Sequence, residues 1–334
     1  MRFLKWLLYI ILALAALILI IPLFLPSEMS IGTTVEVKAT QAQVFHVAAT
    51  YTDRGSWDPW MEMDSTATLE TLPQKEYVGS SYTWKGETIG NGKMQVDSVD
   101  WAKHIWASIW FGPDPRPSQV EWILEPAGDG TLIHWNFHTK MGYPVGRIMM
   151  LLMKKPLQGN FDKGMQNFKA YIEANLPQLS SLSPIEEKVL NPMSAMVVAG
   201  EGTMEEMGPA MGTYFAQLSG AIQNQGLQVS GAPFCQYLEY DPVTGITKYL
   251  VGMPVAKAGK NEGAVMAKTY PEMKVLQAVH TGPYEELYLS YDDFNSYFQS
   301  NGITPKGQAF EFYLNDPMVV KFPTGLETLI AFPY

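Results

Sequence analysis

The chain has 334 residues, of which 47% are hydrophobic and 17% charged, a composition typical of folded domains and not of disordered chains or coiled coils. Its 23 basic and 33 acidic residues give a formal net charge of -10, which argues against a nucleic-acid partner. The single cysteine excludes an intramolecular disulfide framework and a multi-cysteine zinc site.

The N-terminal segment is strongly apolar. Residues 6–25 read WLLYIILALAALILIIPLFL, and no charge lies between Lys5 and Glu28. A run of about 20 apolar residues spans the ~30 Å hydrocarbon core of a bilayer as a helix. We therefore predict a transmembrane anchor over residues 1–27. The alternative is a cleaved secretory signal, whose apolar region is normally about 7–15 residues and ends in a small-x-small site that this segment lacks.

Flanking charges predict the orientation of the anchor. Arg2 and Lys5 precede the span, and Glu28 is the first charge after it. The positive-inside rule places the short N-terminus in the cytoplasm. The predicted location is therefore the cell membrane, crossed once, with the rest of the chain on the extracytoplasmic side.

Composition divides the remaining chain in two. Eight of the nine tryptophans fall between Trp57 and Trp135, and no arginine follows Arg147. Residues 177–184 (PQLSSLSP) are rich in serine and proline, which is typical of a linker. We predict a first domain over 28–177, a linker over 178–192 and a second domain over 193–334.

The first domain has the pattern of an antiparallel sheet closed by a helix. Residues 31–38 alternate like an edge strand, and a short helix follows from residue 40. Strand-like runs then cover 77–87, 91–99, 103–111, 119–125 and 131–139. Apolar residues recur at three- and four-residue steps from Val145 to Ile172, which predicts a long helix. We expect an α+β domain with a curved sheet wrapped around this helix.

This order of elements resembles a known superfamily. With the motif V-x-A-T-x-A-x-V-F within 35–45 and W-x-P-W at Trp57–Trp60, it is similar to the SRPBCC superfamily of START-like and polyketide-cyclase-like helix-grip proteins. The resemblance implies a deep cavity between sheet and helix that holds an apolar ligand. Its members include lipid carriers, cyclases and hydrolase-like enzymes, so the fold alone fixes no reaction.

The first domain offers no clear catalytic group. His134 and His138 share one face of a strand but lie ~13 Å apart along it, too far to bind one metal ion together. An apolar pocket without a paired base and nucleophile favours binding over catalysis. We predict no metal and no cofactor.

The second domain contains an internal repeat. Residues 226–237 (GLQVSGAPFCQY) align with 302–313 (GITPKGQAFEFY) at an offset of 76. The helical stretches 211–225 and 285–301 precede the two copies, and strands at 194–200 and 273–280 precede the helices. Each copy therefore reads strand–helix–strand–strand. We predict a duplicated unit whose copies pack about a pseudo-twofold axis.

This repeat also resembles a known family. Together with His280–Tyr284 (HTGPY), Tyr291 and Phe310–Pro317 (FEFYLNDP), it is similar to the GyrI-like small-molecule-binding domain, the effector-binding module of AraC- and MerR-type multidrug-sensing regulators. No helix-turn-helix precedes it here, which argues against transcriptional regulation.

The GyrI-like resemblance implies an aromatic-lined cleft along the axis, with an acidic residue at its base that maps onto Glu311. Glu311 and Tyr313 share one strand face, and the repeat aligns Tyr237 with Tyr313. It also aligns Cys235 with Glu311, so only one copy carries the charge. The predicted ligand-binding residues are Glu311, Tyr313, Tyr237, Tyr288 and Tyr214, the last two on the predicted helices.

These patterns support two main hypotheses. A carboxylate among aromatic rings suits a lipophilic cation. The first hypothesis is therefore a membrane-anchored protein that binds an apolar ligand in the helix-grip cavity and an amphipathic or cationic compound in the GyrI-like cleft, for sensing, sequestration or carriage. The alternative is a hydrolase that detoxifies reactive hydrophobic molecules, with Glu311 and Tyr313 as its acid/base groups. An interaction scaffold for a membrane partner is a third possibility.

Overall fold

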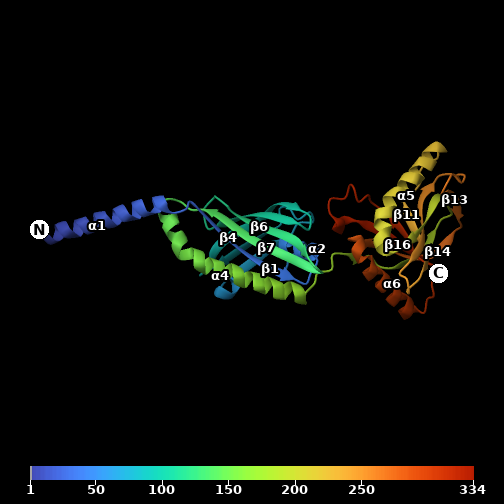
Figure 1. Ribbon diagram of the computed structural model, residues 1–334. Helices are drawn as coiled ribbons and strands as arrows, with labels where there is room; N and C mark the ends of the chain where they lie inside the picture. The colour runs from blue at the N-terminus through green and yellow to red at the C-terminus, as the bar shows by residue number, and fades with distance from the viewer. Residues whose placement is uncertain (1) are drawn as a thin grey trace. The chain divides into compact units, whose positions relative to one another are not determined.

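The computed structural model describes residues 2–334, and Met1, the first residue of the predicted anchor, lies outside this range. Two compact units follow one another along the chain, one ending at Gln178 and the other spanning Leu179–Tyr334. Each unit has its own antiparallel sheet and helices (Figure 1). The predicted α+β class is confirmed.

The N-terminal segment is a helix, α1 (Arg2–Ile20), which tightens into the 3-10 turn η1 (Ile21–Phe24) at Pro22. Residues 5–24 have a mean hydropathy of 3.0, and they are long and apolar enough to cross a bilayer. Because the helix lies near the N-terminus, where a secretory signal can meet the same criteria of length and composition, these properties fit both an anchor and a signal.

The first unit holds a seven-stranded sheet in the order β1-β7-β6-β5-β4-β3-β2. Its strands are β1 (Glu28–Val37), β2 (Thr68–Leu72), β3 (Ser81–Gly86), β4 (Gly90–Asp100), β5 (His104–Phe111), β6 (Ser118–Ala127) and β7 (Gly130–Lys140). The meander is confirmed, with β1 at one edge. The sequence did not predict β2, because this short edge strand is almost wholly exposed and has no alternating buried face. β3 begins later than predicted, because Tyr77 adopts a left-handed turn with a φ of 65°.

Short helices and one long helix complete this unit: α2 (Gln41–Thr50), α3 (Arg54–Trp57), the 3-10 turn η2 (Met61–Met63) and α4 (Val145–Ala174). Thr40 and Gln43 form a capping box that starts α2 where the sequence predicts it. α4 runs along the sheet (Figure 1), and Phe161, Met165 and Phe168 form its buried face. The predicted helix-grip arrangement is therefore present.

Aromatic rings fill the interior between α4 and the sheet. Trp122 and Trp135 stack with their centroids 5.1 Å apart, and Phe161 lies 4.3 Å from Trp135. Phe168 packs edge-on against Trp57 at 4.9 Å. Trp57, Trp122 and Trp135 are thus buried core residues, and the deep ligand cavity implied by the resemblance stays a prediction.

The second unit holds a nine-stranded sheet in the order β13-β10-β12-β11-β15-β16-β14-β8, with β9 also paired to β14. Its strands are β8 (Ser181–Leu182), β9 (Glu186–Leu190), β10 (Met193–Gly202), β11 (Phe234–Tyr240), β12 (Thr247–Val255), β13 (Val265–Tyr270), β14 (Met273–Thr281), β15 (Phe310–Tyr313) and β16 (Glu327–Pro333). Its helices are α5 (Met204–Asn224) and α6 (Leu287–Asn301), with 3-10 turns η3 (Tyr284–Glu286) and η4 (Pro323–Gly325).

Each copy of the repeat folds as strand–helix–strand–strand, as the sequence predicts: β10-α5-β11-β12 and β14-α6-β15-β16. α5 begins earlier than predicted, because Thr203 and Glu206 form a capping box and the helix continues through Pro209. Within the predicted linker 178–192, β8 and β9 pair with β14.

The two copies meet at the β11–β15 pair. Its register is Phe234 with Phe312, Cys235 with Glu311, and Gln236 with Phe310. When each residue is replaced by its equivalent at the repeat offset of 76, the Phe234–Phe312 pair becomes the Phe310–Gln236 pair. The Cys235–Glu311 pair becomes itself, because these two residues are equivalent to each other. The predicted pseudo-twofold axis therefore passes between Cys235 and Glu311.

We expect Phe168→Ala to lower the free energy of unfolding of the first unit by about 3–5 kcal/mol, because Phe168 is fully buried against tryptophan rings. Chemical denaturation followed by tryptophan fluorescence reports on this unit, since the second unit contains no tryptophan. Exposed Gln166 on the same helix provides the control: Gln166→Ala should change stability by about 0.5 kcal/mol or less. Similar losses in the two variants would contradict the assigned core face.

Candidate functional site

A buried carboxylate occupies the pseudo-twofold axis of the second unit. Glu311 is only 2% exposed, and three tyrosine hydroxyls donate hydrogen bonds to it. Tyr291 donates to Oε1 at 2.7 Å, Tyr237 to Oε2 at 3.1 Å and Tyr313 to Oε2 at 3.4 Å. Both carboxylate oxygens thus have donors.

Three elements bring these donors together. Tyr313 lies two residues from Glu311 on β15, so both side chains point to the same face of the sheet. Tyr237 comes from β11, the strand paired with β15, and Tyr291 comes from α6. The rings of Tyr237 and Tyr291 meet edge to face at 6.5 Å, and Tyr284 lies 5.8 Å from Tyr313 in the same manner. The carboxylate therefore sits within an aromatic cluster.

The surroundings of Glu311 favour either its protonated form or an ionised form that is paired with a cation. Burial raises the pKa of Glu311, and the hydrogen bonds from the three tyrosines only partly oppose this rise. Among the side chains of residues 2–334 that the structure describes, no basic one forms an ion pair with Glu311. A charged Glu311 would thus be a buried anion without a cation, an arrangement that is costly.

The neighbouring groups stay protonated. Burial, and then the Glu311 carboxylate, raises the pKa of Tyr237, Tyr291 and Tyr313 well above the usual tyrosine value. The same two causes raise the pKa of the Cys235 thiol. The tyrosines therefore act as hydrogen-bond donors, and Cys235 stays a neutral thiol rather than a nucleophile.

The structure brings three of the five predicted binding residues together: Glu311, Tyr313 and Tyr237. Tyr214 on α5 packs against the same apolar cluster as Tyr237 and Tyr313, with its ring 6.2 Å from that of Tyr249 on β12. Tyr288 on α6 is 62% exposed. Both tyrosines lie on the two helices, as predicted.

Tyr291 belongs to the cluster but was not among the predicted binding residues. A usable signal was present in the repeat: at the offset of 76, Tyr291 corresponds to Phe215. The second copy therefore carries an extra hydroxyl on its helix as well as the extra carboxylate on its strand. The extra hydroxyl, on Tyr291, and the extra carboxylate, on Glu311, are hydrogen-bonded to each other.

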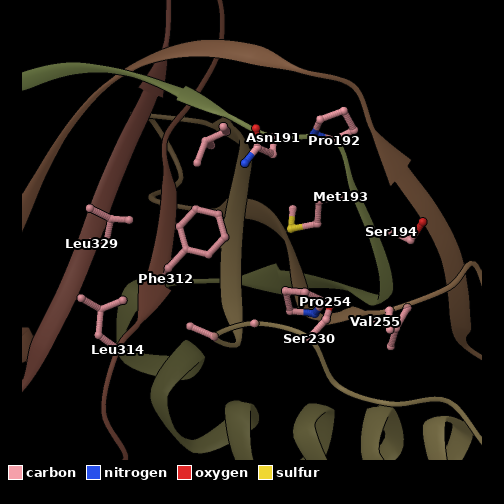
Figure 2. Close-up of a pocket in the computed structure, with 14 residues that line it drawn as sticks. Asn191, Pro192, Met193, Ser194, Ser230, Pro254, Val255, Phe312, Leu314 and Leu329 are labelled. Atoms are coloured by element: carbon pink, nitrogen blue, oxygen red, sulfur yellow. The ribbon is translucent and has the colours of Figure 1, made fainter.

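A separate pocket of about 560 Å³ lies on the opposite face of the sheet (Figure 2). The ring of Phe312 points into it, and because side chains alternate along β15, Glu311 points to the other face. Among the described residues, those that line this pocket carry no charge. Its lining residues are Leu190, Asn191, Pro192, Met193, Ser194, Ser230, Gly231, Ala232, Pro254, Val255, Ala256, Phe312, Leu314 and Leu329.

The first unit has a buried ion pair of its own. Arg54, 1% exposed, bonds Asp58 at 2.7 Å, and its guanidinium lies 4.0 Å from the centre of the Trp57 ring. Asp58 also accepts a hydrogen bond from the Trp60 backbone at 2.9 Å. Because Asp58 balances the charge of Arg54, this pair adds no net charge to the interior.

The two histidines noted in the sequence, His134 and His138, contact hydroxyl groups on the neighbouring strand. Nδ1 of His134 lies 3.0 Å from the hydroxyl of Thr34, and Nδ1 of His138 lies 2.9 Å from that of Ser30. Both contacts join β7 to β1.

Family comparisons match both halves of the chain. Residues 29–173 match the family described as polyketide cyclase / dehydrase and lipid transport. Residues 183–334 match the family described as GyrI-like small molecule binding domain. Both resemblances inferred from the sequence are therefore confirmed.

Several solved structures match at low identity. The C-terminal domain of EcmrR is 18% identical, with 47% of this chain and 98% of that chain covered and a TM-score of 0.39. A hydrolase from Listeria innocua is 15% identical, covering 45% and 90%, with a TM-score of 0.34. The Aha1 dimer from Colwellia psychrerythraea is 14% identical, covering 44% and 96%, with a TM-score of 0.30. No curated protein matches the chain.

We expect Glu311→Gln to change how the stability of the second unit depends on pH. A carboxyl group whose pKa is raised by folding contributes stability below its unfolded pKa of about 4.3, and this contribution is lost as pH rises through the folded pKa. The wild type should therefore lose stability relative to Glu311→Gln as pH rises. Calorimetric melting of the full chain between pH 4 and about pH 8 measures the difference.

Glu272→Gln is the matched control, because Glu272 is exposed between β13 and β14. It should follow the wild-type pH dependence. If Glu311→Gln did the same, Glu311 would not have a raised pKa.

We expect Arg54→Met to cost about 3–5 kcal/mol of first-unit stability, because it leaves Asp58 as a buried charge without its partner. Adding Asp58→Asn should restore part of the loss, since the second change removes that charge. Denaturation followed by tryptophan fluorescence compares the two. A double variant no more stable than Arg54→Met would contradict the charge explanation.

Proposed function

Because the chain joins a domain of the polyketide cyclase, dehydrase and lipid transport family to a GyrI-like small-molecule-binding domain, we propose that it is a membrane-anchored small-molecule-binding protein. In this proposal α1 is retained as the anchor, with both domains on the extracytoplasmic side. The helix-grip domain, residues 28–177, binds an apolar ligand. The GyrI-like domain, residues 193–334, binds an amphipathic or cationic compound, for sensing, sequestration or carriage.

The observation that carries the proposal is the state of Glu311. It is a buried carboxylate with three hydroxyl donors and, among the described contacts, no cationic partner. A lipophilic cation would supply the missing charge, and its apolar groups would pack against the surrounding rings. The tyrosine hydroxyls would keep the carboxylate oriented.

Burial also sets a condition on binding. Since Glu311 is only 2% exposed, a ligand reaches it only when a ring of the cluster moves aside. Tyr291 can do so by a shift of α6, whereas Tyr237 and Tyr313 are held on paired strands at the centre of the sheet. We therefore expect binding to be coupled to a change in α6.

A second candidate function is hydrolysis. The raised pKa of Glu311 suits a general acid or base, and Tyr313 lies 3.4 Å from its carboxylate. Since Cys235 stays a neutral thiol, the nucleophile would be water. This alternative requires turnover of a reactive hydrophobic substrate that Glu311→Gln abolishes while binding of the substrate survives.

Titration with tetraphenylphosphonium tests the cation site. We expect the full chain in detergent to bind this cation, and Glu311→Gln to weaken binding at least tenfold, equivalent to about 1.4 kcal/mol. Binding should also strengthen as pH rises through the raised pKa of Glu311, because the cation favours the ionised form. Isothermal titration calorimetry in buffers of different ionisation enthalpy measures both the affinity and the released proton.

Two controls make this test specific. Triphenylphosphine oxide, a neutral molecule of similar shape, should bind more weakly than the cation. Tyr240→Phe should leave affinity unchanged, because Tyr240 lies exposed at the end of β11. Equal cation affinity in the wild type and Glu311→Gln would refute a role for Glu311 in cation binding.

A further inference from the structure

The start of α4 has an unusual surface. Its first eleven residues, 145–155, here called the proximal segment, expose apolar side chains to between 41% and 67%. These side chains are Val145, Met149, Leu151, Leu152 and Met153. The cost of leaving so many large apolar groups in water indicates that something covers this surface.

The rest of α4 shows the ordinary pattern. After Pro156, the helix buries Phe161 and Phe168 against the sheet and exposes polar residues such as Asp162 and Gln166. Proline removes one backbone hydrogen bond and bends a helix, so Pro156 separates these two parts. Outward-facing apolar residues are therefore concentrated in the proximal segment.

Chain topology places the proximal segment beside the exit of the apolar helix α1. The β1–β7 register pairs Glu28 with Lys140, and the Met141 amide donates to Ser27 at 2.8 Å. The Arg147 guanidinium then donates to the Pro22 carbonyl at 3.0 Å. If α1 spans a bilayer, the start of α4 lies at the surface of that bilayer.

The charges of the segment fit a lipid surface. Lys154 and Lys155 are exposed at its end, and neither forms an ion pair with a carboxylate among the side chains that the structure describes. Large apolar side chains combined with lysines are typical of helices that lie in the headgroup region of anionic membranes. Met150, on the side of the helix that faces the domain, is buried, so the segment remains packed against its own domain.

We propose that the proximal segment of α4 docks into the headgroup region of the membrane that α1 spans. This inference rests on the proposed membrane anchoring and adds a second, interfacial contact to it. It holds the helix-grip domain against the lipid surface, so that an apolar ligand could pass between bilayer and domain without crossing bulk water. A second copy of the chain is the rival occupant of this surface.

Site-directed fluorescence on the full chain tests this contact. Leu152→Cys, 67% exposed, is labelled with the dye NBD, and the protein is reconstituted into phosphatidylcholine–phosphatidylglycerol vesicles. Gln166→Cys is the matched control, on an exposed position of the same helix about 21 Å further along it. The wild-type chain is the labelling blank, because its only cysteine, Cys235, is buried.

We expect the label at position 152 to emit at shorter wavelength than the label at 166. Lipids with a nitroxide on the acyl chain should quench it several-fold more strongly. Equal quenching at both positions in chains retained by the vesicles would overturn the docking proposal and leave the anchor intact. A blue-shifted but unquenched label at 152 would also overturn it, in favour of a protein partner. Release of the chain by alkaline carbonate would refute the anchor itself, and the docking proposal with it.

Discussion

The pairing of β11 with β15 is the constraint on which the architecture of the second unit depends. It joins the two copies of the repeat into one sheet and sets Cys235 opposite Glu311 on the axis. Side chains alternate along a strand, so a slip of one residue would turn Glu311 away from the tyrosines and toward the Phe312 pocket. One register therefore determines both how the two copies join and where the buried carboxyl group lies.

Much of this arrangement could be predicted from the sequence. A repeat with an offset of 76 and a period-two strand were sufficient to place Tyr237 and Tyr313 near Glu311. Helical positions were harder to predict, because the rotation of a helix about its own axis decides which tyrosine faces the sheet. Tyr291 faces Glu311, whereas Tyr288, three residues earlier on the same helix, is exposed.

In the interior of the first unit as well, regular elements could be predicted from the sequence but individual long-range contacts could not. Hydrophobic periodicity predicted the meander and the long helix, because both bury a regular face. Nothing in the segment around Arg54 predicts that a guanidinium is buried among aromatic rings. Its burial depends on Asp58 and on Trp57, which are close to it in sequence, and also on Trp135, a residue of β7 whose ring centre lies 5.6 Å away. Such long-range contacts cannot be read from local patterns.

The position of Glu311 on the pseudo-symmetry axis also bears on the origin of the domain. In a homodimer of two identical half-domains, any residue on the axis meets a second copy of itself, and two glutamates at that distance would repel each other. Fusion of the two copies into one chain removes this restriction, because each copy can then mutate alone. A single buried carboxyl group at the centre of the sheet is thus a feature that two copies in one chain allow and that two identical half-domains do not.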